Sequence, residues 1–139
     1  MESKIVVDTN VVMSALLSDS RTRELMRDLD AELYAPEHLK QEVEKHRDLM
    51  LERSGLDEGE LDALVERLFR HLRFVGSEEL ELHREAAKEA IVEVDPDDVV
   101  FVATALSVDA VVWSDGSDLR RQDAVDVVTT PDVVEMTEG

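Results

Sequence analysis

Asp8 stands where a buried strand is expected to end. The segment KIVVDTNVVMSALLS, residues 4–18, places this aspartate after a β-branched run, and apolar residues at helical spacing follow at once. In open α/β sheets the functional crevice lies beyond the carboxyl ends of the strands. Asp8 is therefore a candidate catalytic or metal-binding carboxylate. The alternative, and the commoner role of aspartate at such a junction, is a turn or a helix cap.

Glu42 belongs to a segment with one apolar stripe, formed by Leu39, Val43, His46 and Met50. At the helical angle per residue, Glu42 projects about 60° from the centre of this stripe, whereas Glu44 projects about 140° away. Glu42 is thus expected to border the buried face. His46 lies one turn later and is interpreted as a partly buried core residue.

Asp98 opens the apolar segment DPDDVVFVATAL, residues 95–106. The same helical geometry places Asp98 about 40° from Val102, on the inward side. The alternative is a local role, in which Asp95 is the N-cap, Pro96 is the first helical residue and Asp98 completes a variant of the capping box.

A fourth acidic group lies in WSDGSDL, residues 113–119, after another expected strand. Two carboxylates about 4 Å apart repel each other by about 4 kcal/mol at an effective dielectric of about 20, so such a cluster must take up protons or cations. The chain has no cysteine, and oxygen ligands with retained waters indicate Mg²⁺ or Mn²⁺. Such ions activate water and stabilise the transition state of phosphodiester hydrolysis.

The composition indicates a folded, strongly acidic protein. The 139 residues are 43% hydrophobic, and 34 acidic against 15 basic residues give a formal charge of −19. At molar salt the Debye length is about 3 Å, which would screen this repulsion, so a halophilic cytoplasm is the favoured explanation over a basic partner. No apolar run reaches the length of a membrane span and no signal peptide is evident, so a cytoplasmic protein without a membrane association is expected.

Short apolar strands alternate with helical segments along the whole chain. Strands are expected at residues 4–7, 33–36, 73–76, 110–113 and 126–130. Helices are expected at residues 21–29, 37–53, 57–72, 78–92 and 96–107, besides the one after Asp8 and a short one at the C-terminus. Asp57 and Glu60 are expected to form a capping box, and the helix after them has more apolar surface than a peripheral helix needs, which favours a homodimer. The nearly all-apolar segment 99–107 is expected to be a buried helix. This alternation predicts a single domain over residues 1–139, an α/β three-layer sandwich with a short central parallel sheet.

The motifs, taken together, resemble the PIN-domain nucleases. VVDTNVVMSAL, APEHLKQEVEKH, DPDDVVFVATAL and VVWSDGSDL occur in the order seen in that family, in a branch with E-x-x-x-H, D-P-D-D-V and W-S-x-D-like elements. The resemblance places the family's first three acids on Asp8, Glu42 and Asp98. Asn10, Asp95 and Ser114 match supporting polar positions.

The fourth acid departs from the family pattern, because Gly116 stands where the first aspartate of S-x-D-x-D normally lies. Asp118 keeps the register and is favoured as the replacement. Asp115 lies one residue early, and would reach a metal through a shifted loop if Gly116 adopts positive φ. Slow, metal-dependent turnover is the expected consequence.

The resemblance implies a divalent-metal-dependent endoribonuclease with RNA as its substrate, a homodimer, and a toxin role with an antitoxin protein as partner. A catalytically weak PIN scaffold that binds RNA or a protein is the alternative. A receiver-type phosphoacceptor would need a late lysine, and none follows Lys88. Candidates for a basic rim that attracts phosphates are Arg21, Arg23, Lys40, Lys45, Arg47, Arg120 and Arg121.

Overall fold

The computed structural model describes residues 3–17, 21–90, 96–116, 119 and 124–138, with the side chains of residues 90, 96 and 97 left aside. In this part of the chain the strands are β1 Ser3–Val7, β2 Ala31–Pro36, β3 Leu72–Val75, β4 Val111–Trp113 and β5 Val127–Val128. The helices are α1 Thr9–Ala15, α2 Arg21–Asp28, α3 His38–Lys45, α4 Arg47–Ser54, α5 Glu58–Phe69, α6 Ser77–Glu81, α7 Arg84–Ala90, α8 Pro96–Val108 and α9 Thr130–Glu138.

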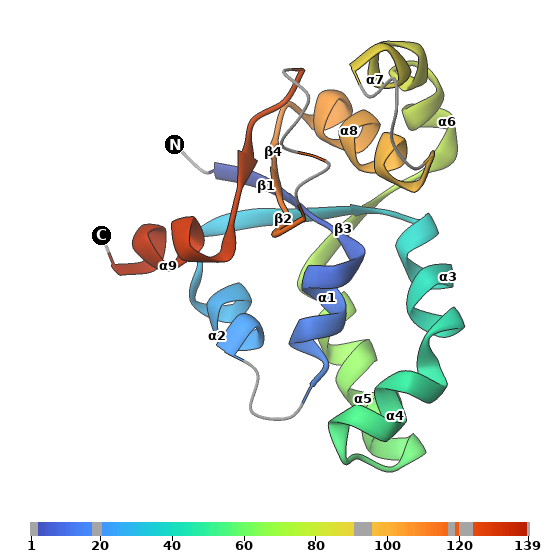
Figure 1. The fold of residues 1–139 in the computed structure, drawn as a ribbon, viewed down its shortest axis with the longest axis vertical. Helices are drawn as coiled ribbons and strands as arrows, with labels where there is room; N and C mark the ends of the chain where they lie inside the picture. The colour runs from blue at the N-terminus through green and yellow to red at the C-terminus, as the bar shows by residue number, and fades with distance from the viewer. Residues whose placement is uncertain (1–2, 18–20, 91–95, 117–118, 120–123, 139) are drawn as a thin grey trace.

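The strands form one parallel sheet in the order β3-β2-β1-β4-β5. Helices α6, α7 and α8 lie on one side of this sheet, and α1, α2, α4, α5 and α9 lie on the other (Figure 1). The predicted three-layer α/β sandwich with a parallel sheet is confirmed. Because all strands run the same way, their carboxyl ends meet at one edge of the sheet.

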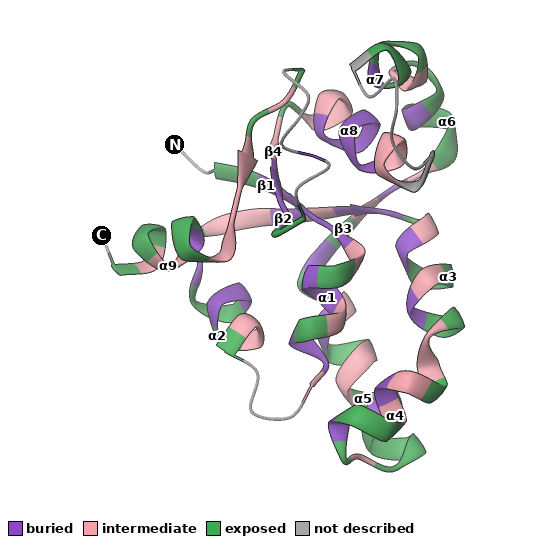
Figure 2. Cartoon of the chain, viewed as in Figure 1, coloured by how far each residue is buried: buried purple, intermediate pink, exposed green. Residues whose placement is uncertain are grey.

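The core lies between the sheet and its two helical layers. The three residues Ile5, Val6 and Val7 of β1 have no exposed surface, as expected for a central strand covered on both faces (Figure 2). Helix α8 also contributes buried residues along its length, including Phe101 and Val102. The prediction that this nearly all-apolar helix is buried is confirmed.

The long helix expected over residues 37–53 is divided into α3 and α4 at His46. The backbone of His46 has φ −101° and ψ 15°, and its N–H donates to the carbonyls of both Glu42 and Val43. The regular helical hydrogen-bond pattern is therefore lost there, although the apolar stripe continues. The helix expected over residues 78–92 is also divided, into α6 and α7.

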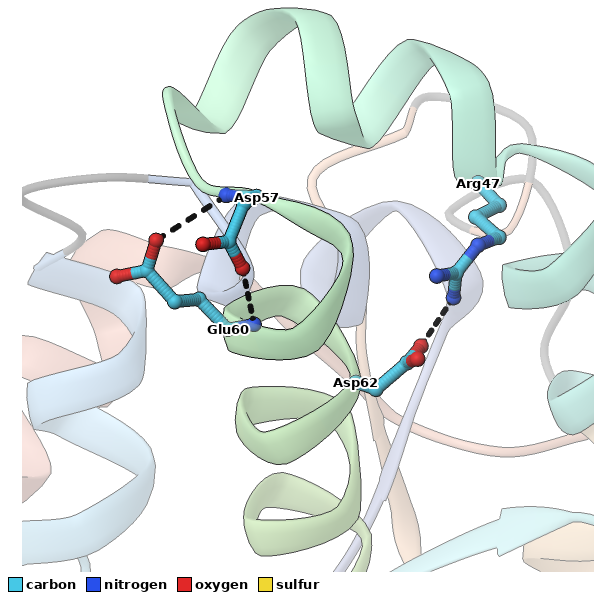
Figure 3. Close-up of polar contacts among 4 residues, drawn as sticks. All are labelled: Arg47, Asp57, Glu60 and Asp62. Carbon is cyan, nitrogen blue, oxygen red and sulfur yellow. Dashed lines mark hydrogen bonds and ion pairs between the residues drawn. The ribbon is translucent and has the colours of Figure 1, made fainter.

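Helix α5 begins with the predicted capping box. The Asp57 carboxylate accepts from the Glu60 N–H at 2.8 Å, and Glu60 accepts from the Asp57 N–H at 3.2 Å (Figure 3). Its apolar residues Leu61 and Leu68 are buried, and among the described residues the exposed large hydrophobic side chains are Leu82 and Met136. The apolar face of α5 is thus buried or half-buried against the core, and the homodimer expected from this helix stays a prediction.

Candidate active site

Asp8 lies at the carboxyl end of β1 and caps helix α1. Its carboxylate accepts a hydrogen bond from the Val11 N–H at 2.8 Å, and its own N–H donates to the Trp113 carbonyl of β4 at 3.2 Å. The side chain and backbone together are 7% exposed. Both roles weighed from the sequence are thus compatible, because the capping geometry holds the carboxylate at the sheet edge.

The surroundings of Asp8 disfavour its ionised form. Burial raises the pKa of its carboxyl, and the neighbouring Asp115 carboxylate raises it further, against opposing hydrogen bonds from the Ser114 side chain and the Val11 N–H. The described groups that act on this pKa include no lysine or arginine. A buried carboxylate beside a second carboxylate is an environment that a cation would relieve.

Ser114 follows β4 and lies against Asp8. It is 1% exposed, and its hydroxyl accepts from the Gly116 N–H at 3.1 Å besides hydrogen bonding to Asp8. Asn10, also expected to support the acids, is exposed in the first turn of α1. A hydrogen bond from its backbone N–H lowers the pKa of Asp8. Ser114 therefore links the loop after β4 to the carboxylate of Asp8.

Asp115 is exposed and holds the start of helix α9. It accepts from the Thr130 N–H at 2.7 Å and from the Thr130 hydroxyl at 2.6 Å, while the Trp113 indole N–H donates to the same hydroxyl at 3.0 Å. Gly116 does not adopt positive φ, so the backbone condition under which Asp115 was expected to reach a metal is not met in this structure. Asp118 lies outside the described residues.

Glu42 projects from α3 with its side chain 18% exposed, in agreement with the expectation that it borders the buried face. Its two carboxylate oxygens lie 3.2 Å from Nε2 of His38 and 4.0 Å from Nε2 of His46. His38 was not predicted as part of the site, although its i,i+4 spacing to Glu42 is a signal for such a pair. The His46 side chain is 38% exposed at the helix break, so this residue is partly buried, as expected, and lies at the edge of the core.

Asp98 is half-buried in the first turn of α8. That turn lies at the same end of the sheet as Asp8, because α8 runs back along the sheet to enter β4 (Figure 1). The helix begins at Pro96 as expected, and Asp95 lies outside the described residues.

The structure places Ser114 and Asp115 near Asp8 and positions Glu42 and Asp98 on neighbouring elements. Within the described ranges, no three acidic or histidine side chains approach closely enough to hold an ion by themselves. The donors at this edge are carboxylate and hydroxyl oxygens, which suit a hard cation that keeps part of its water shell. The donor atoms of these residues therefore fit a hard divalent cation.

Several candidates for the basic rim are engaged in local contacts. Arg23 donates to the carbonyls of Ala15 and Leu17 at the end of α1, Arg47 pairs with Asp62 (Figure 3), and Nζ of Lys40 lies 4.3 Å from the centre of the Phe74 ring. Arg21 and Lys45 are exposed. Arg120 and Arg121 lie outside the described residues.

No helix in the described part of the chain is long and apolar enough to cross a membrane.

Comparisons with solved structures support the fold. The complex VapBC2 from Rickettsia felis, bound to a DNA fragment from its promoter, has a chain with a TM-score of 0.68 and 10% identity, covering 91% of this chain and 98% of that one. A chain of FitAB bound to an IR36 DNA fragment has a TM-score of 0.65 and 20% identity, covering 90% and 94%. No curated protein matches the sequence.

A family profile matches most of the chain, including every described residue of the candidate site. The profile of the PIN domain matches residues 6–131, a range that includes Asp8, Glu42, Asp98 and the loop after β4. The chain therefore belongs to the PIN-domain family.

Proposed function

We propose that this protein is a divalent-metal-dependent endoribonuclease that hydrolyses RNA phosphodiester bonds. PIN domains are nucleases as a family. The observation that carries the proposal is Asp8, a buried carboxylate at the sheet edge whose pKa is raised by burial and by a second carboxylate. Structural capping alone does not require that burial, since Asp57 caps α5 in the same way while exposed.

Asp8, Glu42 and Asp98 would hold Mg²⁺ or Mn²⁺. When bound, such an ion supplies positive charge to the phosphate and lowers the pKa of water. Ser114 orients the Asp8 carboxylate through its hydroxyl, and His38 fixes one oxygen of Glu42. Partners of this kind keep ligands in one orientation and tune their basicity.

The fourth carboxylate is proposed to be Asp118, with Asp115 as the alternative. Both oxygens of Asp115 already accept hydrogen bonds from Thr130, so moving Asp115 to a metal would break both of these bonds to the first residue of α9. Asp95 and Asn10 are proposed only as supporting residues. A site with three acids and a weak fourth ligand is expected to turn over slowly.

RNA cleavage by the Asp8→Asn variant tests the proposal. The assay uses single-stranded RNA in molar KCl, to screen the charge of −19, with Mg²⁺, Mn²⁺ or EDTA. Cleavage should require the metal and should fall at least about 10²-fold in Asp8→Asn. The matched control is Asp57→Asn, which changes an equivalent N-cap away from the site. Equal activity in the two variants would contradict the proposal.

The second candidate function is a PIN scaffold that binds RNA or a protein with little catalysis. It is favoured because no three acidic or histidine side chains of the described residues group closely enough to hold an ion. Metal-independent RNA binding without cleavage by the wild-type protein would support this function.

A toxin role with an antitoxin partner is proposed from the two similar complexes, VapBC2 and FitAB. Growth arrest on expression, relieved by the product of an adjacent small gene, is the expected result. A homodimer remains proposed on the family resemblance. A monomeric mass by light scattering in molar KCl would reject it.

A further inference from the structure

A cavity of about 520 Å³ opens beside the candidate site, between α3 and the helices α6, α7 and α8. We call it the α7 cavity. Its walls include His38 from α3, Val75 from the end of β3, Arg84 and Lys88 from α7, and Val99 from α8. Its volume falls within the range of about 300–1,000 Å³ that is typical of ligand sites.

Two residues that line the α7 cavity neighbour proposed metal ligands. His38, in its wall, contacts Glu42 at 3.2 Å, and Val99 follows Asp98 in the first turn of α8. Val75 ends β3, so the cavity lies at the carboxyl edge of the sheet, where Asp8 also lies. A chain of substrate that crosses this edge would therefore extend from the candidate site into the cavity.

Arg84 and Lys88 give the cavity two cationic side chains on one face of α7. Their ion pairs are long, 3.7 Å from Arg84 to Glu81 and 3.7 Å from Lys88 to Glu85, and both cations are partly exposed. Exposed pairs of this kind are weak and yield readily to a stronger anion. Glu37 also lines the cavity, and its charge opposes an anion, so both cations are needed there.

These cations differ from the basic residues that the sequence singled out. Arg23 is held by two backbone carbonyls and Arg47 by Asp62, whereas Arg84 and Lys88 project into a cavity. In a chain of charge −19, an RNA backbone must find such local positive charge to approach the acids.

We infer that the α7 cavity binds a backbone phosphate of single-stranded RNA next to the one that is cleaved, through Arg84 and Lys88. This inference rests on the proposed nuclease function and identifies the residues that position its substrate. Phosphate contacts of this kind fix the register of a nucleic acid without reading its sequence.

The test measures binding of a fluorescein-labelled single-stranded RNA of mixed sequence to the full chain carrying Asp8→Asn, at several KCl concentrations. Adding Arg84→Gln and Lys88→Gln should raise Kd about tenfold at the lowest salt at which circular dichroism shows a folded protein. The slope of log Kd against log salt should fall by about 0.7 for one lost phosphate contact. The matched control adds Arg53→Gln and Arg70→Gln, which remove the same charge from exposed positions on α4 and next to α5.

Equal Kd values and equal slopes in the two double variants would overturn the inference. The proposed nuclease function would still stand if cleavage by the otherwise unaltered protein depended on Asp8 and on metal. Conversely, a selective loss of RNA binding in the Arg84 and Lys88 variant, with no cleavage by the wild-type protein, would support the cavity and contradict the nuclease.

Discussion

The two acids best described at the sheet edge, Asp8 and Glu42, are held in different ways. Asp8 is fixed by the core: it ends the central strand, caps α1 and lies against the buried Ser114. Glu42 lies on a helix at the periphery and is fixed by two histidines one turn away on either side. The position of Asp8 is thus set by the fold, whereas the position of Glu42 depends on a few side chains.

This difference also separates the ways in which the two acids can be perturbed. Replacing a neighbour of Asp8 disturbs buried packing, because Trp113 and Ser114 are both nearly inaccessible. Replacing a histidine beside Glu42 changes half-exposed positions and should leave the fold intact. The contribution of orientation to catalysis is therefore measured most cleanly on α3.

The largest effect on α3 is expected for Glu42→Gln. Removing the charge of a proposed metal ligand should lower RNA cleavage by about 10²-fold, in line with the loss of a contact that stabilises the transition state. The matched control is Glu44→Gln, an exposed glutamate on the same helix that points away from the apolar stripe. Cleavage rates in saturating Mn²⁺ measure both, and equal rates would remove Glu42 from the site.

A smaller effect is expected for His38→Gln. Groups that orient a metal ligand typically change metal affinity by about 10- to 100-fold when they are removed, and His38 lies 3.2 Å from Glu42. His46→Gln should change it much less, because His46 is at 4.0 Å and is partly exposed. Calorimetric titration with Mn²⁺ compares the two variants. A larger loss in His46→Gln would reverse the assignment of the orienting histidine.

The features that the sequence predicted are those set by local spacing. Asp8 follows from a β-branched strand joined directly to a helix, and the capping box of Asp57 and Glu60 follows from three residues of separation. The inward side of α3 was also predictable, since Glu42 is mostly buried as the helical geometry required.

The features that it missed depend on backbone detail or on long-range contacts. The break at His46 arises from one N–H shared between two carbonyls, and the apolar stripe runs through it without interruption. The engagement of Asp115 with Thr130 joins residues 15 positions apart across the ends of β4 and β5, so no periodicity reveals it. The metal-ligand roles of Asp8, Glu42, Asp98 and Asp118 stay predictions.

The Gly116→Asp variant adds a carboxylate to the loop after β4, on the side of the site that the core holds in place. A Cβ at Gly116 would meet the Ser114 hydroxyl oxygen at an ordinary 3.5 Å, and its φ is not positive, so aspartate fits without backbone strain. The added carboxylate should tighten Mn²⁺ binding and raise the cleavage rate a few-fold, roughly the gain from one more oxygen ligand. Calorimetry and RNA assays in molar KCl measure both. No change in either would mean that this loop does not face the metal.

The smallest effect concerns the pH dependence of stability. It tests whether burial of the ionised Asp8 carboxylate lowers the free energy of unfolding. The pKa of Asp8 is raised in the folded protein, first by burial, so above its unfolded value of 3.8 the native state binds more protons than the unfolded state. In EDTA, the contribution of Asp8 to the free energy of unfolding should therefore fall as pH rises from about 4 through the raised pKa, and then level off.

Asp8→Asn keeps an N-cap acceptor for Val11 but lacks this titration. Denaturant unfolding in molar KCl measures the free energy of unfolding of both proteins. As pH rises in EDTA, the wild type should lose stability relative to the variant. Mn²⁺ in place of EDTA should reverse this loss, because it stabilises only the wild type. A difference that stays constant between about pH 4 and 7 would show that Asp8 ionises as freely in the folded chain as in the unfolded one, against its burial and its proximity to Asp115.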